Sequence, residues 1–211
     1  MTNIIIVRHG EVAGNAGDKK AFVGWGDLEL NERGLRQTEA VGQYLQNETI
    51  DAVYSSDLQR ARITAESVAA PHNLTVQIDP DFREVNYGDW EGLSEAELLG
   101  QYGPQWQARQ NDPWNVAAIG GENHAQMWAR FLPKWDALVE RHEGQTAVLV
   151  GHNGLIRILL CHLLGAPFSN FKRIHVSNCS VTRVEIESGS SDAPQILIQG
   201  INQTSHLQHI L

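Results

Sequence analysis

His9 and His152 each come two positions after a continuous run of four apolar residues, 4–7 and 147–150. Such runs are typical of strands buried on both faces of a parallel sheet, and ligands of open α/β sheets bind at the carboxyl ends of the strands. A neutral imidazole can act as a nucleophile through one ring nitrogen when an acceptor, often a backbone carbonyl, holds the other. Taken alone, His9 is more simply explained by a hydrogen bond at a strand end. Two histidines in the same setting indicate a catalytic site.

Two arginines stand where they can bind an anion. Arg8 is next to His9, and Arg60 falls in the first turn of a helix expected after the second strand. An arginine in a first turn opposes the helix dipole unless it binds an anion, and its planar guanidinium matches the geometry of phosphate. A surface ion pair between Arg60 and Asp57 explains the position equally well. The helix start after His152 adds free N–H groups, which also favour an anion.

Glu84 precedes a loop rich in glycine and aromatic residues, 85–92. A partly desolvated carboxylate in such a loop can act as a general acid. On this segment alone, a solvated loop carboxylate is the simpler interpretation. Glu84 is therefore a candidate only in combination with the histidines and arginines.

The elements that must position these groups alternate along the chain. The pattern predicts helices beginning near Asn31, Asp57, Asn123 and Asn153, with Asn31 and Asn153 as capping residues. It predicts strands at residues 4–7, 52–54, 75–78, 147–150, 181–186 and 196–201. This alternation indicates an α/β fold, a three-layer α/β/α sandwich with a mostly parallel central sheet. The last two strands are expected to form an edge hairpin. Pro133, inside the helix after Asn123, predicts a kink.

Residues 80–121 interrupt this alternation. They are rich in glycine, proline and tryptophan, with short helical pieces expected near residues 94–99 and around Trp106. We interpret them as an inserted, partly helical cap. A length of 211 residues suits a single domain, residues 1–211, with such an insertion.

The composition excludes several classes of protein. The chain has 25 acidic and 16 basic residues, a net charge of -9 and a pI near 5.4, which disfavours a nucleic-acid-binding face or a basic membrane anchor. The N-terminal apolar run is too short for a signal peptide, and no segment is long enough to span a membrane. Cys161 and Cys179 make no disulfide framework and are expected to be buried thiols. We therefore expect a reduced, soluble, cytoplasmic protein.

Together these segments closely resemble the histidine phosphatase superfamily, in its phosphoglycerate mutase-like branch of phosphatases. The resemblance covers nearly the whole chain and depends on six blocks in order. The blocks are Arg8-His9-Gly10-Glu11 with Asn15, Gly24-Trp25-Gly26-Asp27-Leu28-Glu29-Leu30 with Gly34, Ser55-Ser56-Asp57-Leu58 with Arg60-Ala61 and Thr64-Ala65, Glu84 with Tyr87-Gly88 and Trp90-Glu91-Gly92, Gly120-Gly121-Glu122, and Gly151-His152-Asn153-Gly154 with Arg157. Val12, where the family frequently has a hydroxyl residue, and the loop 15–24 with Lys19 and Lys20 depart from the pattern and affect substrate contacts only.

The resemblance implies a role for each matching residue. His9 would be the nucleophile that accepts the phosphoryl group, and Glu84 would protonate the leaving oxygen. The phosphate oxygens would be held by Arg8, Arg60 and His152, and further substrate contacts are expected from Asn15, Gly24, Tyr87 and Asn153. The family uses no metal, so neither a metal site nor another cofactor is expected. Two arginines, a histidine and a helix N-terminus can neutralise a transferring phosphoryl group without an ion.

These roles predict a phosphomonoester hydrolase that acts through a phosphohistidine intermediate on a small phosphorylated metabolite. Phosphoglycerate mutase activity is the alternative, and a phospho-ligand binding module without catalysis is disfavoured because all the candidate catalytic residues are present. The mutase is disfavoured because residues 85–121 contain one basic residue, Arg109, and because Val85 stands where mutases of the family carry an arginine. The chain also lacks the longer insertion of those mutases. Nothing in the sequence indicates an oligomeric state.

The same segment suggests what the pocket selects. Trp90, Trp106 and Trp114 supply large rings where cations are few. The sequence therefore predicts a preference for apolar or aromatic leaving groups. Packing of the cap by these tryptophans is the alternative.

Overall fold

A six-stranded sheet forms the centre of the protein, which is described here by a computed structural model of residues 1–13, 21–187 and 195–210. The strands lie in the order β3-β2-β4-β1-β5-β6. Neighbours among β1 to β4 are parallel, and β5 and β6 pair antiparallel at one edge. Their bounds are β1 (Thr2–Arg8), β2 (Ala52–Ser55), β3 (Val76–Ile78), β4 (Thr146–Gly151), β5 (Val181–Glu187) and β6 (Gln195–Gln203). The turn predicted between β5 and β6 lies outside the described residues, as do Asn15, Lys19 and Lys20.

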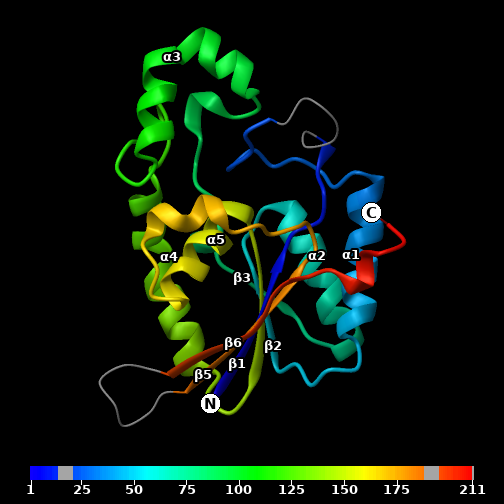
Figure 1. The fold of residues 1–211 in the computed structure, drawn as a ribbon. Helices are drawn as coiled ribbons and strands as arrows, with labels where there is room; N and C mark the ends of the chain where they lie inside the picture. Colours follow the sequence, from blue (N-terminus) through cyan, green and yellow to red (C-terminus); the bar gives the residue numbers. More distant parts are fainter. Residues whose placement is uncertain (14–20, 188–194, 211) are drawn as a thin grey trace.

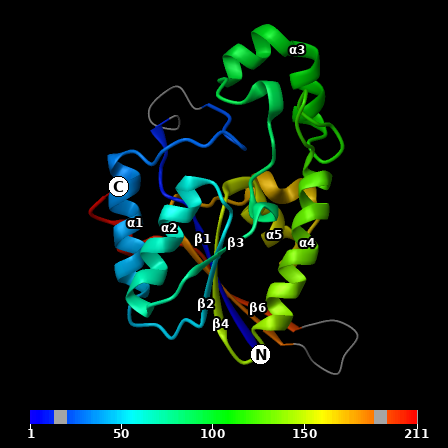
Figure 2. The ribbon, with the colours of Figure 1, turned by 180° about the vertical axis from the view of Figure 1, so that it is seen from behind.

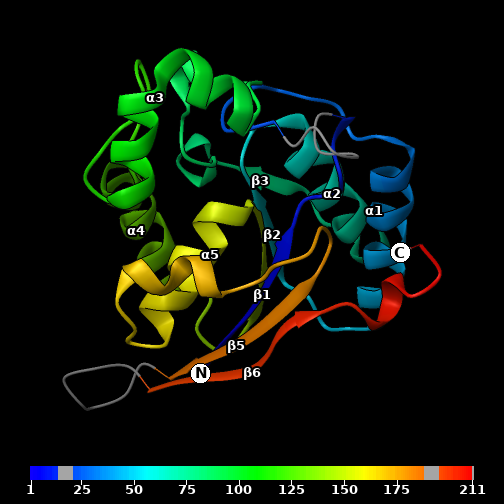
Figure 3. The ribbon, with the colours of Figure 1, turned by 45° about the horizontal axis from the view of Figure 1, so that its top comes forward.

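Helices cover both faces of the sheet, which confirms the three-layer α/β/α sandwich (Figures 1 and 3). They are α1 (Glu32–Leu45), α2 (Gln59–Ala69), α3 (Glu95–Asn111), α4 (His124–Arg141) and α5 (Asn153–Leu163). Successive side chains of β1 point to opposite faces, as in any strand. Ile4 and Ile6 pack with α4 and α5, whereas Ile5 and Val7 pack with α1 and α2. The continuous apolar run is therefore explained by burial on both sides.

Side-chain caps begin two of the helices where the sequence predicted them. Asn31 accepts a hydrogen bond from the Gly34 amide at 2.7 Å and starts α1. Asn123 and Gln126 form a reciprocal capping box that starts α4. α4 continues through Pro133 as one helix, with Phe131 and its neighbours on the buried side.

The segment between β3 and α4 lies beyond the carboxyl ends of the parallel strands (Figures 1 and 2). It contains η3 (Pro80–Phe82), η4 (Gly88–Trp90) and α3. The sequence predicted two short helical pieces here. The structure has a single helix, α3, which is interrupted at Tyr102, two residues before Pro104. The segment between β3 and α4 has a small core of its own, which contains Trp90, Leu98, Trp106 and Ala118. That this segment is an insertion in a single domain stays a prediction.

Two further expectations from the composition concern burial. Cys161 and Cys179 are buried and unpaired, as predicted. Among the helices of the described ranges, none combines the length and apolarity that a membrane crossing requires.

Candidate active site

His9 follows the last residue of β1 and is 5% exposed. Its Nδ1 lies 2.7 Å from the Gly10 carbonyl oxygen. Because a carbonyl only accepts, Nδ1 carries the hydrogen and Nε2 keeps its lone pair. Burial lowers the pKa of His9 well below the ordinary histidine value, and the charges of Arg60 and Arg8 lower it further. His9 is therefore a neutral imidazole at pH 7 with Nε2 as its basic atom.

The backbone around His9 is fixed from several elements. The His9 amide donates to Gly151 at 3.0 Å, and Asn178 donates from Nδ2 to the His9 carbonyl at 2.9 Å. Thr64 accepts from the Gly10 amide at 3.1 Å. A Cβ on Gly10 would lie 2.7 Å from the carbonyl oxygen of residue 34, so only glycine fits there. Asn178 carried no motif, and its position could not be found from sequence.

His152 lies beside His9, with 5.1 Å between the ring centroids. The two meet because β1 and β4 are adjacent parallel strands whose last residues are paired in register. Nε2 of His152 lies 2.8 Å from the Ser56 hydroxyl, and its buried Nδ1 has no hydrogen-bond partner within the described residues. Burial, followed by the charge of Arg60, lowers the pKa of His152 well below the ordinary value. The hydroxyl of Ser56 can donate to Nε2, which places the ring hydrogen on Nδ1.

Arg60 is 1% exposed. Its guanidinium donates from Nη1 to the Gly26 carbonyl at 2.7 Å and from Nη2 to the Gly24 carbonyl at 2.6 Å. The alternative ion pair with Asp57 is wrong, because Asp57 accepts instead from Arg83 Nε at 2.6 Å. Arg60 is thus a buried cation held by neutral carbonyl groups, which leaves its charge available to an anion.

Glu91 fixes the loop whose backbone carbonyls accept hydrogen bonds from Arg60. Its carboxylate accepts from the amides of Gly24 and Trp25 at 2.8 Å each, and from the Gly26 amide at 3.2 Å. A Cβ on Gly24 would lie 2.0 Å from the carbonyl oxygen of residue 85, so the loop requires glycine there. Gly24 was predicted to contact substrate, and in the structure its carbonyl positions Arg60.

Arg8 lines the same cleft as His9. Its Nη1 donates to the Val176 carbonyl at 2.7 Å, and its buried Nε has no partner in the described part of the chain. Burial lowers the pKa of Arg8 to about 10, although the Glu84 carboxylate opposes this change. Arg8 therefore remains a cation at pH 7 beside the candidate nucleophile.

Glu84 caps the helix that follows His152. Its carboxylate accepts from the Gly154 amide at 2.7 Å, the Leu155 amide at 3.2 Å and the Val85 amide at 3.0 Å. The sequence predicted Asn153 as the capping residue, and this is wrong, because α5 begins with Asn153 itself and has no side-chain cap of its own. The bound carboxylate shows that this helix start attracts an anion, as expected.

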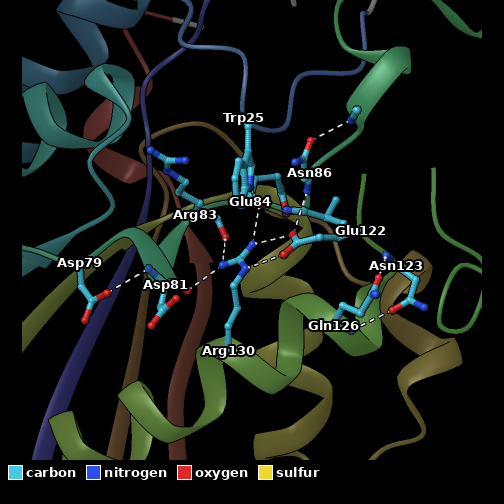
Figure 4. A network of polar contacts seen from close by, with 12 residues as sticks. Trp25, Asp79, Asp81, Arg83, Glu84, Asn86, Glu122, Asn123, Gln126 and Arg130 are labelled. Carbon is cyan, nitrogen blue, oxygen red and sulfur yellow. Dashed lines mark hydrogen bonds and ion pairs between the residues drawn. The ribbon is translucent and has the colours of Figure 1, made fainter. Parts of the chain in front are cut away.

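Arg130 fixes the backbone of Glu84 from α4 (Figure 4). It donates to the carbonyl of Asp81 at 2.7 Å, of Arg83 at 3.0 Å and of Glu84 at 2.8 Å. The same guanidinium forms two hydrogen bonds to the carboxylate of Glu122, at 2.9 and 3.0 Å. Both side chains are mostly buried, so this bidentate pair is well placed to hold the turn rigidly.

Two neighbours complete this network. Glu122 also accepts from the Asn86 amide at 3.0 Å, and Trp25 donates from its indole to the Glu84 carbonyl at 2.8 Å. Trp25 belongs to the loop that holds Arg60. The general-acid candidate Glu84 and the candidate phosphate-binding residue Arg60 are therefore joined through one set of hydrogen bonds.

This arrangement of strand-end histidines and buried arginines agrees with the sequence comparisons. The family model described as "Histidine phosphatase superfamily (branch 1)" matches residues 4–196. The chain belongs to the histidine phosphatase superfamily. It is 31% identical to phosphoserine phosphatase 1 of Hydrogenobacter thermophilus and 32% identical to a probable phosphoglycerate mutase, GpmB, of Yersinia pestis, covering 98% of this chain and 95% of each relative. The solved structure of Bacillus stearothermophilus YhfR has a TM-score of 0.89 at 26% identity, covering 99% of this chain and all of that one (100%).

The active cleft of this superfamily member has a volume of about 1050 Å³. Of the residues predicted to act on the substrate, His9, Arg8, Glu84, Tyr87 and Asn153 line it, whereas Arg60, His152 and Gly24 are not among its lining residues. Asn15 cannot be placed because it lies outside the described residues. The roles of these side chains in catalysis stay predictions.

Residues 85–121 contribute only one cation, Arg109, to the cleft, but other elements add further cations, so the cleft as a whole is not poor in positive charge. Arg109 turns inward, is 3% exposed and lines the cleft together with Arg157 and Lys172. Trp90 is fully buried inside the cap, and Trp114 stacks on Phe168 with ring centroids 4.2 Å apart. Trp90 and Trp114 therefore pack the protein, and Trp106 belongs to the buried core of the cap while also lining the cleft. Sequence reasoning missed Arg157 as a cleft residue, although its place on the helix after His152 was a usable signal.

Proposed function

We propose that this chain is a metal-independent phosphomonoester hydrolase that acts on a small phosphorylated metabolite through a phosphohistidine intermediate. The observation that carries the proposal is the 2.7 Å hydrogen bond from His9 Nδ1 to the Gly10 carbonyl, which leaves Nε2 as the nucleophilic atom. Arg8 and Arg60 lie close enough to depress the pKa of that ring. A neutral nucleophile beside two cations suits attack on a phosphate anion.

In the first step, the lone pair of His9 Nε2 attacks phosphorus, and the bond between phosphorus and the leaving oxygen breaks. Glu84, protonated at the start of this step, gives its proton to that oxygen and is left as a carboxylate, so the product leaves as a neutral alcohol. Arg8, Arg60 and the free Nδ1 of His152 hold the other phosphate oxygens. Their positive charge and N–H donors stabilise the transferring group.

In the second step, water attacks the phosphohistidine, and the bond between phosphorus and nitrogen breaks. The Glu84 carboxylate takes a proton from the water, and inorganic phosphate leaves with His9 neutral again. Both oxygens of Glu84 accept backbone N–H groups in the described conformation. Each proton transfer therefore requires one oxygen to leave its amide, and a phosphate oxygen can replace it at the start of α5.

A trapping experiment tests this proposal. Wild-type protein mixed with a labelled monoester and quenched rapidly is expected to carry an acid-labile, base-stable phosphoryl label. His9→Ala is expected to carry no label and to lose turnover, while His72→Ala, which removes a histidine from η2 (Ala70–His72), behaves as wild type. Turnover by a folded His9→Ala protein refutes the nucleophile.

Phosphoglycerate mutase activity is the second candidate. The basic residues of the cleft favour it, and so does the similarity to the Yersinia pestis relative. A panel of monoesters assayed for phosphate release, with mutase activity measured in parallel, separates the two. A mutase converts phosphoglycerate without a matching release of phosphate, whereas a hydrolase releases one phosphate for each substrate consumed.

We further propose that the protein works in the cytoplasm on small molecules rather than on nucleic acid. The net charge of -9 argues against nucleic acid as a substrate, because nucleic acid repels an acidic protein. The buried, unpaired thiols of Cys161 and Cys179 support a cytoplasmic location, because a reducing compartment keeps thiols free. Cell fractionation with an antibody to the protein tests the location.

A further inference from the structure

The peptide unit between Gly10 and Glu11 orients the ring of His9. Its carbonyl oxygen, which belongs to Gly10, lies 2.7 Å from His9 Nδ1. Residue 10 is a glycine, so no Cβ restricts the rotation of this peptide unit. A rotation would turn the carbonyl away from the ring and allow the ring hydrogen to reside on Nε2, the atom that has to attack. The function of His9 therefore requires a second group that fixes this peptide unit.

Gln37 binds the opposite side of the same peptide unit. The Glu11 amide donates to Gln37 Oε1 at 3.0 Å. Because a backbone amide only donates, the side-chain atom that faces it is the carboxamide oxygen. Gln37 is 2% exposed, so water does not readily replace this hydrogen bond. The Gln37 carboxamide, the peptide unit and the His9 imidazole thus form a line of two hydrogen bonds, each of which polarises the other.

The start of α1 is packed against Glu11, which brings Gln37 to this place. The Asn31 amide donates to the Glu11 carbonyl at 3.0 Å. Gly34 approaches so closely that a Cβ on it would lie 2.0 Å from the same carbonyl oxygen. Gln37 follows three residues after Gly34 and therefore lies on the same side of the helix. Asn31, Gly34 and Gln37, spaced three apart, all act on the segment that follows His9.

The preceding peptide unit, between His9 and Gly10, has anchors of its own. Asn178 donates to its carbonyl at 2.9 Å, and Thr64 accepts from its amide at 3.1 Å. These two contacts hold the main chain of His9 whether or not Gln37 is present. Loss of the Gln37 side chain is therefore expected to change the orientation of the imidazole rather than the position of the residue.

The partner of Nδ1 decides the tautomer because the His9 ring is neutral at pH 7. Burial, followed by the charges of Arg60 and Arg8, lowers the pKa of His9 well below the ordinary value. A neutral imidazole carries one hydrogen, and the hydrogen bond at one nitrogen determines which nitrogen holds it. Fixing the Gly10 carbonyl therefore fixes the atom that is free to attack.

We propose that Gln37 is a positioning residue for phosphoryl transfer, which holds the Gly10 carbonyl toward His9 Nδ1 and so keeps Nε2 free to attack. Its effect on catalysis rests on the proposed function, whereas its effect on the His9 tautomer rests on the geometry alone. Gln37 also lines the cleft. A direct contact between Gln37 and the substrate is the alternative, and it would change substrate binding instead of the ring.

Nitrogen NMR of isotope-labelled histidine rings tests the tautomer without turnover. Gln37→Met removes the acceptor oxygen and keeps the length of the side chain. At pH 7 the wild-type protein is expected to carry the His9 hydrogen on Nδ1, and Gln37→Met is expected to show a mixture of both tautomers. The spectrum of His9→Ala identifies the His9 signals among those of the nine histidines. Gln43→Met is the matched control, because Gln43 is exposed on the same helix and donates to Glu39.

Rapid-quench kinetics with a labelled monoester measure the consequence for the reaction. In Gln37→Met the rate of His9 labelling is expected to fall about tenfold or more, while the dissociation constant of the substrate stays within about twofold. Gln37→Glu keeps an acceptor oxygen at the same distance along the side chain and is expected to recover most of the rate. Gln37→Asn withdraws the oxygen by one methylene and gives the same test if Gln37→Met does not fold.

Three results overturn the proposal. They are a wild-type tautomer in a folded Gln37→Met protein, weaker substrate binding with an unchanged labelling rate, and a folded Gln37→Glu protein that is no faster than Gln37→Met. The two readouts also keep this proposal apart from the proposed function. If His9→Ala turns over and the tautomer still depends on Gln37, the nucleophile fails and the positioning role stands. If the wild-type protein forms phosphohistidine and Gln37→Met matches it in both readouts, the hydrolase stands and the positioning role fails.

Discussion

Replacing Arg130 by methionine removes the guanidinium that fixes the backbone of Glu84 while keeping much of the apolar stem. The variant loses three hydrogen bonds to carbonyls and the bidentate pair with Glu122. Side chains of Arg130 and Glu122 are 16% and 18% exposed, so water replaces these contacts only in part. Removing one partner of a buried ion pair lowers the free energy of unfolding by about 3–5 kcal/mol. Because water reaches this pair in part, we expect a loss of about 3 kcal/mol for Arg130→Met.

The effect on stability is measured by urea denaturation and thermal unfolding. For a chain of this size, about 3 kcal/mol corresponds to a fall in Tm of roughly 6–12 °C. Removing Glu122 as well is expected to cost less than the sum of the single variants, because Arg130→Met already leaves that carboxylate without its partner. Arg62→Met, which breaks an exposed pair on α2, is expected to cost about 0.5 kcal/mol or less.

The effect on activity separates positioning from simple stability. If Arg130 acts through Glu84, kcat falls by about tenfold or more for alkyl phosphates, whose leaving oxygen needs a proton. The fall is smaller for p-nitrophenyl phosphate, whose leaving group departs without full protonation. Equal losses for both esters below the unfolding temperature refute this reasoning, as does a variant with unchanged Tm.

Three further outcomes are expected. Arg60→Ala is expected to lower kcat/KM by about a hundredfold or more, because it removes a buried cation from the transferring phosphoryl group, and a near-normal rate contradicts this role. Chelators are expected to leave activity unchanged, because the arginines and the start of α5 supply the positive charge; inhibition reversed by added metal contradicts it. Acid is expected to destabilise the fold, since His9, His124 and His152 have folded pKa values below the ordinary 6.5. The unfolded chain then binds more protons as pH falls below 6.5, so unfolding free energy drops by about 1 kcal/mol for each histidine between pH 6.5 and about 5.5, measured by urea titrations at each pH.

The sheet and the meeting of the two histidines at its carboxyl end could be predicted from sequence because their signals are local. Apolar runs identified the strands, and parallel register brought His9 and His152 to one edge. The position of Arg60 against the helix dipole left an anion site and a surface pair with Asp57 equally open; the structure excludes the pair, and the anion site stays a prediction. The Gly10 carbonyl partner of His9 was the kind of acceptor that a nucleophilic imidazole requires.

The wall of the cleft could not be predicted because it depends on which way side chains turn. Counting charges along residues 85–121 found Arg109 and treated it as isolated, whereas Arg157 and Lys172 join it from elements far along the chain. The sequence around these tryptophans does not indicate which indole ring is buried in the cap and which lines the cleft. Trp90 and Trp106 are both buried in the small core of the cap, yet Trp106 also lines the cleft and Trp90 does not.

Burial lowers the pKa of His9 most, the charges of Arg60 and Arg8 lower it further, and the same two charges are proposed to bind phosphate. Arg60 and Arg8 disfavour protonation of the ring, so Nε2 stays available as a nucleophile in mildly acidic solution. When a phosphate dianion binds these arginines, it offsets their effect on the ring, and the basicity of Nε2 rises at the moment when it is needed. The attacking nitrogen is therefore protected from protons in the free protein and becomes more basic only in the complex. Substituting either arginine is expected to weaken both the protection and the response, and therefore to lower kcat/KM by more than the loss of a single hydrogen bond would.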